Sequence, residues 1–191
     1  MNPFELFNEC FTEELELTSV RIPSACCLST IGTDGFPNSR FVSLKEIMDD
    51  KFIITGPLYS KKAVEMEKSN KVSLTFWWTQ TEKQIRIQGN ASKISDLLAD
   101  KYFYERGRDS QIVSVVSEQG EEIEDLEDLK EKYERTKLLH ENQIILRPNN
   151  WGGFSIDPIR IEFMEFKNTR FHDRKLFEKK DDQWTIKKIQ P

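Results

Sequence analysis

Strand-like segments follow one another along this chain through links that are too short to hold a crossover helix. Antiparallel strands can be joined by a tight hairpin, whereas parallel strands need a connection of roughly a dozen residues or more. Gly32-Thr33-Asp34-Gly35 and Asp49-Asp50 are typical of hairpin turns. Strands are expected at residues 25–31, 40–47, 52–55, 72–78, 84–94, 153–166, 170–177 and 184–189. This order predicts a mainly antiparallel sheet or barrel, with helices packed outside it.

Helices are expected before the strands and in the middle of the chain. In residues 3–17 apolar side chains recur at spacings of three and four, as on one face of an amphipathic helix; they are Phe4, Phe7, Phe11 and Leu15. Ser60 is a typical N-cap for a second helix. Two more helices are expected at 95–106 and 107–120. The acidic segment 121–141 is expected to be a solvated helix whose apolar stripe comprises Ile123, Leu126, Leu129 and Tyr133.

Chain length favours a single α+β domain over residues 1–191, without repeats or low-complexity linkers. Within it we expect an N-terminal helix at 1–17, a helical insertion at 95–141 and C-terminal strands at 151–191. Thirteen Phe and four Trp exclude a disordered chain. No apolar run approaches the ~18 residues that a membrane helix needs. The formal net charge of −5 argues against non-specific nucleic-acid binding.

The cysteines and the N-terminus indicate a cytoplasmic protein. Cys10, Cys26 and Cys27 have neither metal-ligand spacing nor an even pairing framework, which suggests a reducing compartment. The first residues lack the basic start and the apolar core of a signal peptide. Only His140 and His172 are available as imidazoles, so a multi-histidine metal site is excluded.

Cations beside hydroxyl groups are the most informative polar clusters, because no glycine-rich phosphate loop, HExxH motif or nucleophile elbow occurs. No pair of catalytic carboxylates can be chosen among 33 acidic residues. Strand alternation places Arg40 and Lys45 on opposite faces. Lys61 and Lys62 follow Ser60 at a helix start, which suits a phosphate, although solvated surface lysines are the simpler interpretation.

A second cluster lies in the middle of the chain. Tyr102 and Arg106 are four residues apart, and Ser110 continues the same line, so on a helix they would share one face. A planar guanidinium, a phenol and a hydroxyl suit a phosphate monoester. An ordinary exposed helix end explains the same pattern equally well.

A third cluster lies near the C-terminus. If residues 170–177 form a strand, Arg170, His172 and Arg174 share one face, where they repel one another unless an anion binds among them. A solvated sheet edge is the alternative. Upstream, Gly152 and Gly153 would let the backbone approach a ligand, although such a pair is more often a turn or a bulge.

Together these clusters resemble one family along essentially the whole chain. In order, the motifs are Arg40-Phe-Val-Ser-Leu-Lys45, Ser60-Lys-Lys62, Gln84-Ile-Arg-Ile-Gln-Gly89, Tyr102 with Arg106-Gly-Arg-Asp-Ser-Gln111, Ser117-Glu-Gln119, Trp151-Gly-Gly-Phe154, Glu162-Phe163 and Arg170-Phe-His-Asp-Arg174. They are similar to those of the FMN-dependent pyridoxamine (pyridoxine) 5'-phosphate oxidases. The resemblance implies a split β-barrel homodimer with FMN at the subunit interface. It also implies oxidation of pyridoxamine or pyridoxine 5'-phosphate to pyridoxal 5'-phosphate, by hydride transfer to FMN, with O2 as acceptor and H2O2 released.

The resemblance also implies the site residues, and it implies no metal. Those implied to contact FMN are Arg40, Phe41, Val42, Ser43, Leu44, Lys45, Ile54, Thr55, Lys61, Lys62, Gln84, Gln119, Gly120, Met164 and Arg174. Two of these would reach FMN from the partner subunit, namely Gln119 and Arg174. Those implied to bind substrate are Lys45, Tyr102, Arg106, Ser110, Arg170, Phe171 and His172. The expected catalytic pair, covering the pyridine ring near the reacting carbon, is Arg170 and His172.

The chain departs from the family pattern at several positions. Met164 stands where the family usually has Trp, Gly120 where Ser is usual, Lys61 where Arg is more frequent, and Val115 where Trp is common. The family's substrate-covering segment lies upstream of the position of Asn2, so substrate closure is expected to differ. Two other functions fit the pattern: a related flavin oxidase acting on another ring, as in phenazine pathways, or a non-catalytic FMN or pyridoxal-phosphate binding protein.

Overall fold

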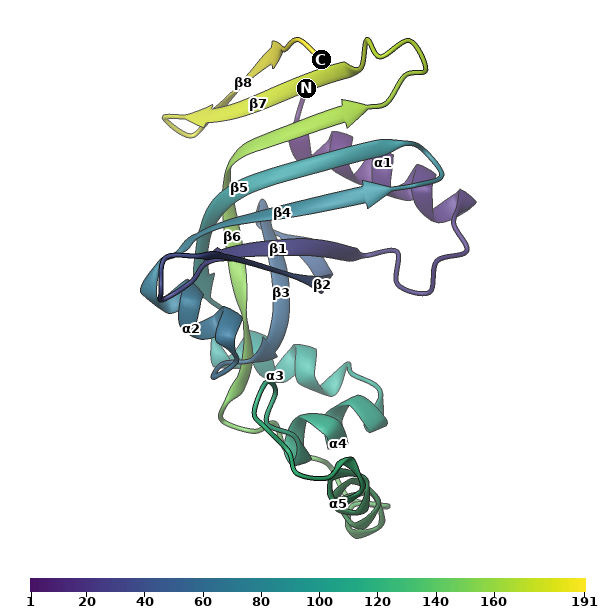
Figure 1. The fold of residues 1–191 in the computed structure, drawn as a ribbon, viewed down its shortest axis with the longest axis vertical. Coiled ribbons are helices and arrows are strands. Elements are labelled where there is room, and N and C mark those ends of the chain that lie inside the picture. The colour runs from purple at the N-terminus through teal and green to yellow at the C-terminus, as the bar shows by residue number, and fades with distance from the viewer. The chain divides into compact units, whose positions relative to one another are not determined.

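An eight-stranded antiparallel sheet dominates the computed structural model, which describes all 191 residues. The strand order is β3-β2-β1-β4-β5-β6-β7-β8, and an additional β3–β6 pairing closes the first six strands into a barrel (Figure 1). The strands are β1 (Ala25–Ile31), β2 (Pro37–Met48), β3 (Lys51–Pro57), β4 (Lys71–Trp78), β5 (Lys83–Lys93), β6 (Trp151–Glu165), β7 (Asp173–Lys180) and β8 (Gln183–Lys188). The predicted split-barrel fold, mainly antiparallel with peripheral helices, is confirmed.

The predicted strands are all present, but the seventh begins later than expected. Residues 167–170 form a turn in which the Arg170 amide donates to the Lys167 carbonyl at 3.0 Å. Arg170 has a φ of 67°, in the left-handed region, so the extended strand starts only at Asp173. The prediction that Arg170, His172 and Arg174 share a strand face is therefore wrong.

The helices are α1 (Pro3–Leu17), α2 (Lys61–Lys68), α3 (Asp96–Tyr104), α4 (Arg108–Val116) and α5 (Leu126–Leu139). None of the five combines the length and the apolar character needed to cross a bilayer. The predicted helix at 95–106 ends early, because Glu105 is the C-cap of α3 and Gly107 is the N-cap of α4. Arg106 therefore lies in the link, and the prediction of one helical line from Tyr102 to Ser110 is wrong.

The chain divides into two compact units: residues 1–54, 65–92 and 155–191 form the first, and residues 55–64 and 93–154 form the second. The core of the first unit is built around Phe7 of α1, which is fully buried. Its ring lies 5.2, 5.1 and 5.4 Å from the rings of Phe52, Phe76 and Trp78, all in edge-to-face geometry. These contacts fix α1 against the strands. At Gly89 a Cβ atom would lie 2.4 Å from the Asp157 carbonyl oxygen, so glycine permits the close approach of β5 and β6.

The buried face of α1 differs from the predicted apolar stripe at its C-terminal end. Leu15 is exposed, whereas Glu14 is buried. The Glu14 carboxylate accepts hydrogen bonds from the Gln80 amide at 3.3 Å and from the Thr81 amide at 2.9 Å. A buried carboxylate is tolerated here because it is hydrogen-bonded. Helical periodicity cannot reveal such a partner in a distant turn.

In the second unit, Arg147 ties the start of β6 to α3. Its Nε and Nη2 atoms contact the carboxylates of Asp100 and Asp96 at 2.5 and 2.9 Å, and Nη1 donates to the Trp151 carbonyl at 2.6 Å. Trp151 is buried against Phe103, with ring centroids 5.2 Å apart. The pair forms the centre of this unit.

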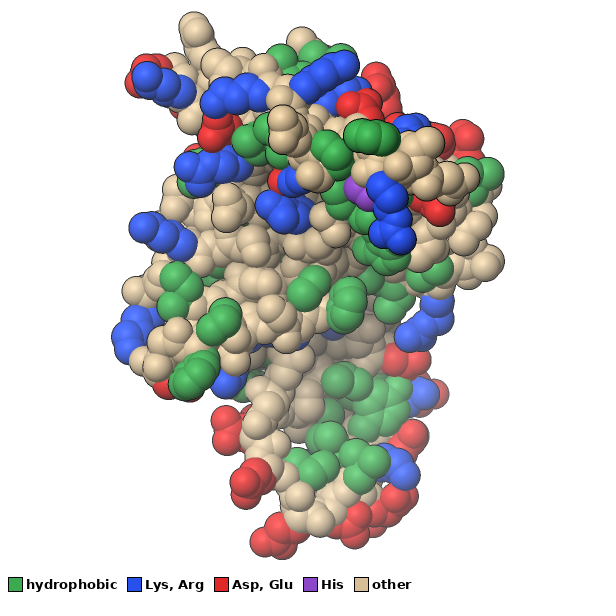
Figure 2. All heavy atoms as spheres, turned by 45° about the horizontal axis from the view of Figure 1, so that its top comes forward, with side chains coloured by type: hydrophobic (Ala, Val, Ile, Leu, Met, Phe, Trp, Pro, Cys, Tyr) green, Lys and Arg blue, Asp and Glu red, His purple; other side chains and the backbone are tan.

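Helix α5 has no fully buried residue, and within the apolar stripe predicted for it only Leu129 and Tyr133 are half-buried. Ile123 precedes the helix, which begins after the N-cap Asp125. Leu126 and Leu138 are exposed. On the face drawn in Figure 2, acidic and apolar side chains lie side by side over the region of α4 and α5.

Candidate functional site

Three of the side chains implied to contact FMN lie together in the first unit. Met164 of β6 is the cross-strand partner of Arg174 on β7. Gln84 of β5 and Met164 line the same cavity. The structure thus brings residues from three adjacent strands to one place, although they are 80 and 10 residues apart in the sequence.

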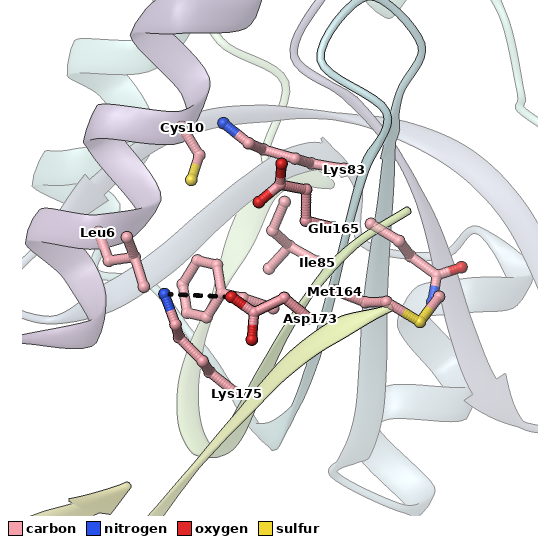
Figure 3. A pocket seen from close by; sticks show the side chains of 10 residues that line it. Leu6, Cys10, Lys83, Ile85, Met164, Glu165, Asp173 and Lys175 are labelled. Carbon is pink, nitrogen blue, oxygen red and sulfur yellow. Dashed lines mark ion pairs between the residues drawn. The ribbon is translucent and has the colours of Figure 1, made fainter. Parts of the chain in front are cut away.

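This cavity has a volume of about 160 Å³ and lies between α1 and the strands (Figure 3). Its walls are partly apolar, from Leu6, Ile85 and Phe163. Its polar lining consists of Cys10, Lys83, Gln84, Glu165, Asp173 and Lys175. The mixture of apolar walls and a few polar groups is typical of small-molecule sites.

Charges around the cavity are largely compensated. Lys83 forms an ion pair with Glu13, and Lys175 lies 3.9 Å from Asp173. Burial alone would lower the pKa of Lys83, but the Glu13 carboxylate outweighs it and the pKa is raised above its ordinary value. Burial raises the pKa of the Cys10 thiol, so the thiol stays protonated at neutral pH.

On the same three strands, a buried carboxylate joins two arginines. Glu162 Oε1 accepts from Nε and Nη2 of Arg174 at 2.9 and 2.6 Å, and Oε2 lies 2.9 Å from Nη2 of Arg86. Glu162 and Arg86 belong to motifs seen in the sequence, but neither of them was assigned a role there. Their contact depends on β6 lying between β5 and β7, which no local pattern reveals.

Arg40 is held by a second buried carboxylate. Its Nη2 atom lies 3.0 Å from Glu65 Oε2, and its Nη1 atom contacts the Thr30 hydroxyl and the Asn38 carbonyl. Burial would raise the pKa of Glu65, but hydrogen bonds from Thr30 and Arg40 outweigh it and lower the pKa. The Arg40 side chain remains 25% exposed, so part of the guanidinium stays available.

Lys62 and Gln119, two more residues implied to contact FMN, meet in the second unit. Lys62 Nζ donates to Gln119 Oε1 at 2.8 Å and to the Ser60 hydroxyl at 3.1 Å. Ser60 immediately precedes α2 as predicted, and its carbonyl accepts from the amides of Ala63 and Val64. The contact joins Lys62 and Gln119 of the same chain, whereas the resemblance implies that Gln119 reaches FMN from the partner subunit.

Arg106 is the most unusual polar group of the second unit. Its guanidinium lies over the Trp151 ring, 5.1 Å from the centroid, and Nη2 donates to the Ser110 carbonyl at 3.3 Å. Its Nε atom is buried and has no hydrogen-bond partner. Burial lowers the pKa of Arg106, and no carboxylate opposes that effect. Tyr102, four residues earlier, is buried. The arrangement leaves a half-buried cation without a carboxylate partner.

Arg170 ends the turn before β7, and His172 lies in the link between that turn and the strand. The Lys167 amide donates to His172 Nδ1 at 3.0 Å, so the neutral imidazole carries its proton on Nε2. The Phe166 ring packs on the imidazole, with centroids 4.8 Å apart. The ring therefore presents a hydrogen-bond donor outward.

The remaining implied site residues are scattered between core and surface. Leu44 and Ile54 are buried in the core, whereas Phe41 and Phe171 are each 79% exposed. The pairing of β2 with β3 slips between Leu44 and Glu46, so simple alternation does not extend to Lys45. The others are intermediate or exposed, namely Val42, Ser43, Thr55, Lys61 and Gly120.

Two protein-family models together match nearly the whole chain. Residues 12–140 match the model of the pyridoxamine 5'-phosphate oxidase family, and residues 151–191 match the pyridoxine 5'-phosphate oxidase C-terminal dimerisation region. The chain belongs to the pyridoxamine 5'-phosphate oxidase family. The family resemblance seen in the sequence is thereby confirmed.

Individual members of the pyridoxamine 5'-phosphate oxidase family agree. A pyridoxine/pyridoxamine 5'-phosphate oxidase of Flavobacterium johnsoniae is 35% identical over 189 residues, covering 98% of this chain and 88% of the relative. One of Leptospira biflexa is 35% identical over 190 residues, covering 100% and 89%. The solved structure of PhzG from Burkholderia lata, in complex with tetrahydrophenazine-1-carboxylic acid, superposes with a TM-score of 0.91 at 26% identity, covering 100% and 93%. A related FMN-binding protein of Nostoc punctiforme shares the fold, with a TM-score of 0.84 at 16% identity and coverage of 100% and 99%.

Proposed function

We propose that the protein oxidises pyridoxamine 5'-phosphate or pyridoxine 5'-phosphate to pyridoxal 5'-phosphate, with FMN as cofactor, O2 as acceptor and H2O2 as by-product; from the amine, water hydrolyses the resulting imine and ammonia is released. The observation that carries the proposal is Arg106, a half-buried guanidinium over Trp151 whose buried Nε has no acceptor. A buried charge without a partner is costly, and a phosphate offers the charged acceptors that would satisfy it. Tyr102 and the Ser110 hydroxyl are the neighbouring groups proposed to share that phosphate.

The side chains implied to hold FMN fit such a cofactor. Arg174 uses three of its five N–H groups on Glu162 and the Gln190 carbonyl, which leaves two for a ligand. Gln84 and Met164 offer an amide and a polarizable thioether beside it. Cations at Arg40, Lys61 and Lys62 supply charge for the FMN phosphate. When bound, FMN supplies the hydride acceptor and returns electrons to oxygen.

The chain itself contributes binding, orientation and charge. Because Nδ1 of His172 already accepts a backbone hydrogen bond, His172 acts by donating a hydrogen bond from its Nε2–H group to an acceptor on the substrate ring. Arg170 is proposed to stabilise charge that develops near the reacting carbon. Its positive φ fixes the backbone from which the side chain extends. Neither residue needs to transfer a proton.

We also propose a homodimer with FMN at the subunit interface. The match of residues 151–191 to a dimerisation region supports this assembly. Sedimentation of the FMN-loaded protein tests it, and a flavin-loaded monomer would contradict it.

A second candidate is oxidation of a carboxylated ring, as favoured by the likeness to PhzG. A ring carboxylate would also satisfy Arg106, but less completely than a phosphate dianion. The two candidates therefore differ in the anion that the second unit binds.

An anaerobic titration of the FMN-loaded protein with pyridoxine 5'-phosphate tests the proposal. Bleaching of the flavin absorbance, followed by recovery in air with formation of pyridoxal 5'-phosphate, is expected. Bleaching only by tetrahydrophenazine-1-carboxylic acid would favour the second candidate. A yellow protein that neither compound bleaches would indicate a non-catalytic flavin-binding protein.

A further inference from the structure

Glu162 is a buried carboxylate that the proposed reaction does not use. It is 5% exposed, and its two oxygens contact two different arginines, Arg174 at 2.6 and 2.9 Å and Arg86 at 2.9 Å. A carboxylate is removed from water at a cost, and here two guanidiniums compensate it. The trio keeps a net charge of +1. The protein has many ion pairs at its surface, but here one buried carboxylate is shared by two arginines.

The position of Glu162 in the sheet connects it to the cofactor-contact candidates. Met164 lies two residues further along β6, so both side chains are on the same face. Arg174, which Glu162 binds, is the cross-strand partner of Met164. Arg86 lies two residues after Gln84 on β5 and shares its face. Each of the two arginines that contact Glu162 therefore lies next to a residue proposed to contact FMN, Arg174 next to Met164 and Arg86 next to Gln84.

The hydrogen-bond geometry fixes Arg174 more tightly than one ion pair would. Nε and Nη2 both donate to Glu162 Oε1, and Nη1 donates to the Gln190 carbonyl at 2.9 Å. Three contacts define the plane of the guanidinium and leave two N–H groups directed elsewhere. The side chain of Arg86 is 54% exposed, so most of its donors also remain available. Glu162 thus orients two cations without using up their donors.

We propose that Glu162 is a positioning residue for flavin binding, acting by holding Arg174 and Arg86 in the orientation that FMN requires. The inference rests on the proposed function, because it needs FMN to bind on this face. It also adds Arg86 to the groups that face the cofactor. Neither Glu162 nor Arg86 is among the residues that the family resemblance implied to contact FMN or substrate.

Two roles of Glu162 predict opposite effects. If Glu162 only neutralises charge, its replacement by Gln adds a positive charge beside the site and strengthens the binding of the FMN anion. If Glu162 positions the arginines, the same replacement releases them and weakens binding. Loss of a residue that orients a ligand group typically costs about 10–100-fold in affinity at metal sites, and we expect a similar loss here.

The test measures FMN affinity of the full-length apoprotein by quenching of flavin fluorescence, together with the thermal midpoint of the apoprotein. Glu162→Gln is expected to raise the Kd for FMN about 10–100-fold. Glu178→Gln is the matched control, because Glu178 also serves two cations on the sheet, Arg160 and Lys187, but does not contact Arg174 or Arg86. Its Kd is expected to stay unchanged. Where Glu162→Gln fails to fold, Glu162→Asp keeps the charge, shortens the reach and is expected to give an intermediate Kd.

A double-mutant cycle separates positioning from a general structural role. In an Arg86→Gln, Arg174→Gln background, Glu162→Gln is expected to leave the remaining FMN affinity unchanged, since the arginines through which it acts are gone. Unchanged or tighter FMN binding by Glu162→Gln alone overturns the inference while the proposed function stands. Failure of the wild-type protein to bind FMN overturns both.

Discussion

Replacing Arg106 by Met is expected to reduce activity on phosphorylated substrates without lowering stability. A fork-shaped contact between guanidinium and phosphate makes two charge-assisted hydrogen bonds, each contributing about 1.5–3 kcal/mol. Their loss removes about 3–6 kcal/mol of binding, which corresponds to a fall in kcat/KM of about 10²–10⁴-fold. Arg106 makes only one hydrogen bond to protein, to the Ser110 carbonyl at 3.3 Å, and a Met side chain replaces its cation–π contact with Trp151 by a sulfur–aromatic contact, so little internal bonding is lost.

The stability of the Arg106→Met variant provides the second half of this test. Arg106 is partly desolvated, and its charge has no carboxylate partner, so an apolar side chain of similar length removes an unfavourable partial burial of charge. We therefore expect an equal or higher thermal midpoint for the apoprotein. Opposite movements of activity and stability are typical of residues kept for binding.

Steady-state oxidation of pyridoxine 5'-phosphate, compared with that of unphosphorylated pyridoxine, measures the effect. The variant is expected to lose its preference for the phosphorylated compound. Arg108→Met is the control, because Arg108 contacts only the carbonyls of His140 and Gln143 at the surface and should leave kcat/KM unchanged. A variant of Arg106 that keeps the preference, or that melts well below the wild type, would show that Arg106 serves the fold.

Three other predictions concern separate parts of the molecule. Phe7→Ala should destabilise the protein by about 3–5 kcal/mol in chemical denaturation, whereas Ala at the exposed Phe36 should have almost no effect. The pKa of Glu65 is lower in the folded than in the unfolded protein. The ionised carboxylate therefore stabilises the fold above the ordinary pKa of a glutamate, and this stabilisation is lost as the pH falls through the lowered value. Glu65→Gln should flatten the decline of the thermal midpoint at acid pH, and an unchanged decline would contradict the prediction. Arg170→Ala should cut turnover far more than FMN retention; loss of flavin with normal turnover on resupply would refute its assigned role.

The strand segments and the hairpin turns could be predicted from the sequence because they depend on neighbouring residues, whereas the pairings of β1 with β4 and of β3 with β6 join distant segments. Asp49 and Asp50 both have positive φ in the structure, at 50° and 59°, as expected for a tight hairpin. The turn at Arg170 could not be predicted in the same way. Its positive φ is not marked by glycine, and the flanking Phe and His residues suggest an extended strand.

Contacts between distant segments account for most of what the sequence left open. Glu14 is buried because Gln80 and Thr81 donate to it, and periodicity assigned that position to the solvent. Glu162 stood in a recognised motif, but its two arginines come from the neighbouring strands. Site residues in the sequence were obtained from family resemblance, and the structure adds the carboxylates that hold them.

The exposure of helix α5 has a consequence for local unfolding of the protein. A segment without buried residues loses little when it unfolds, so α5 is expected to form its own cooperative unit at the low end of the stability range. Its polar contacts with Asp109 of α4, the hydrogen bond from Tyr133 at 2.6 Å and the ion pair with Lys137 at 3.9 Å, lie at the surface. Amide protons in α5 should therefore exchange with solvent through brief local openings while the barrel stays closed, and peptide insertions should be tolerated there first.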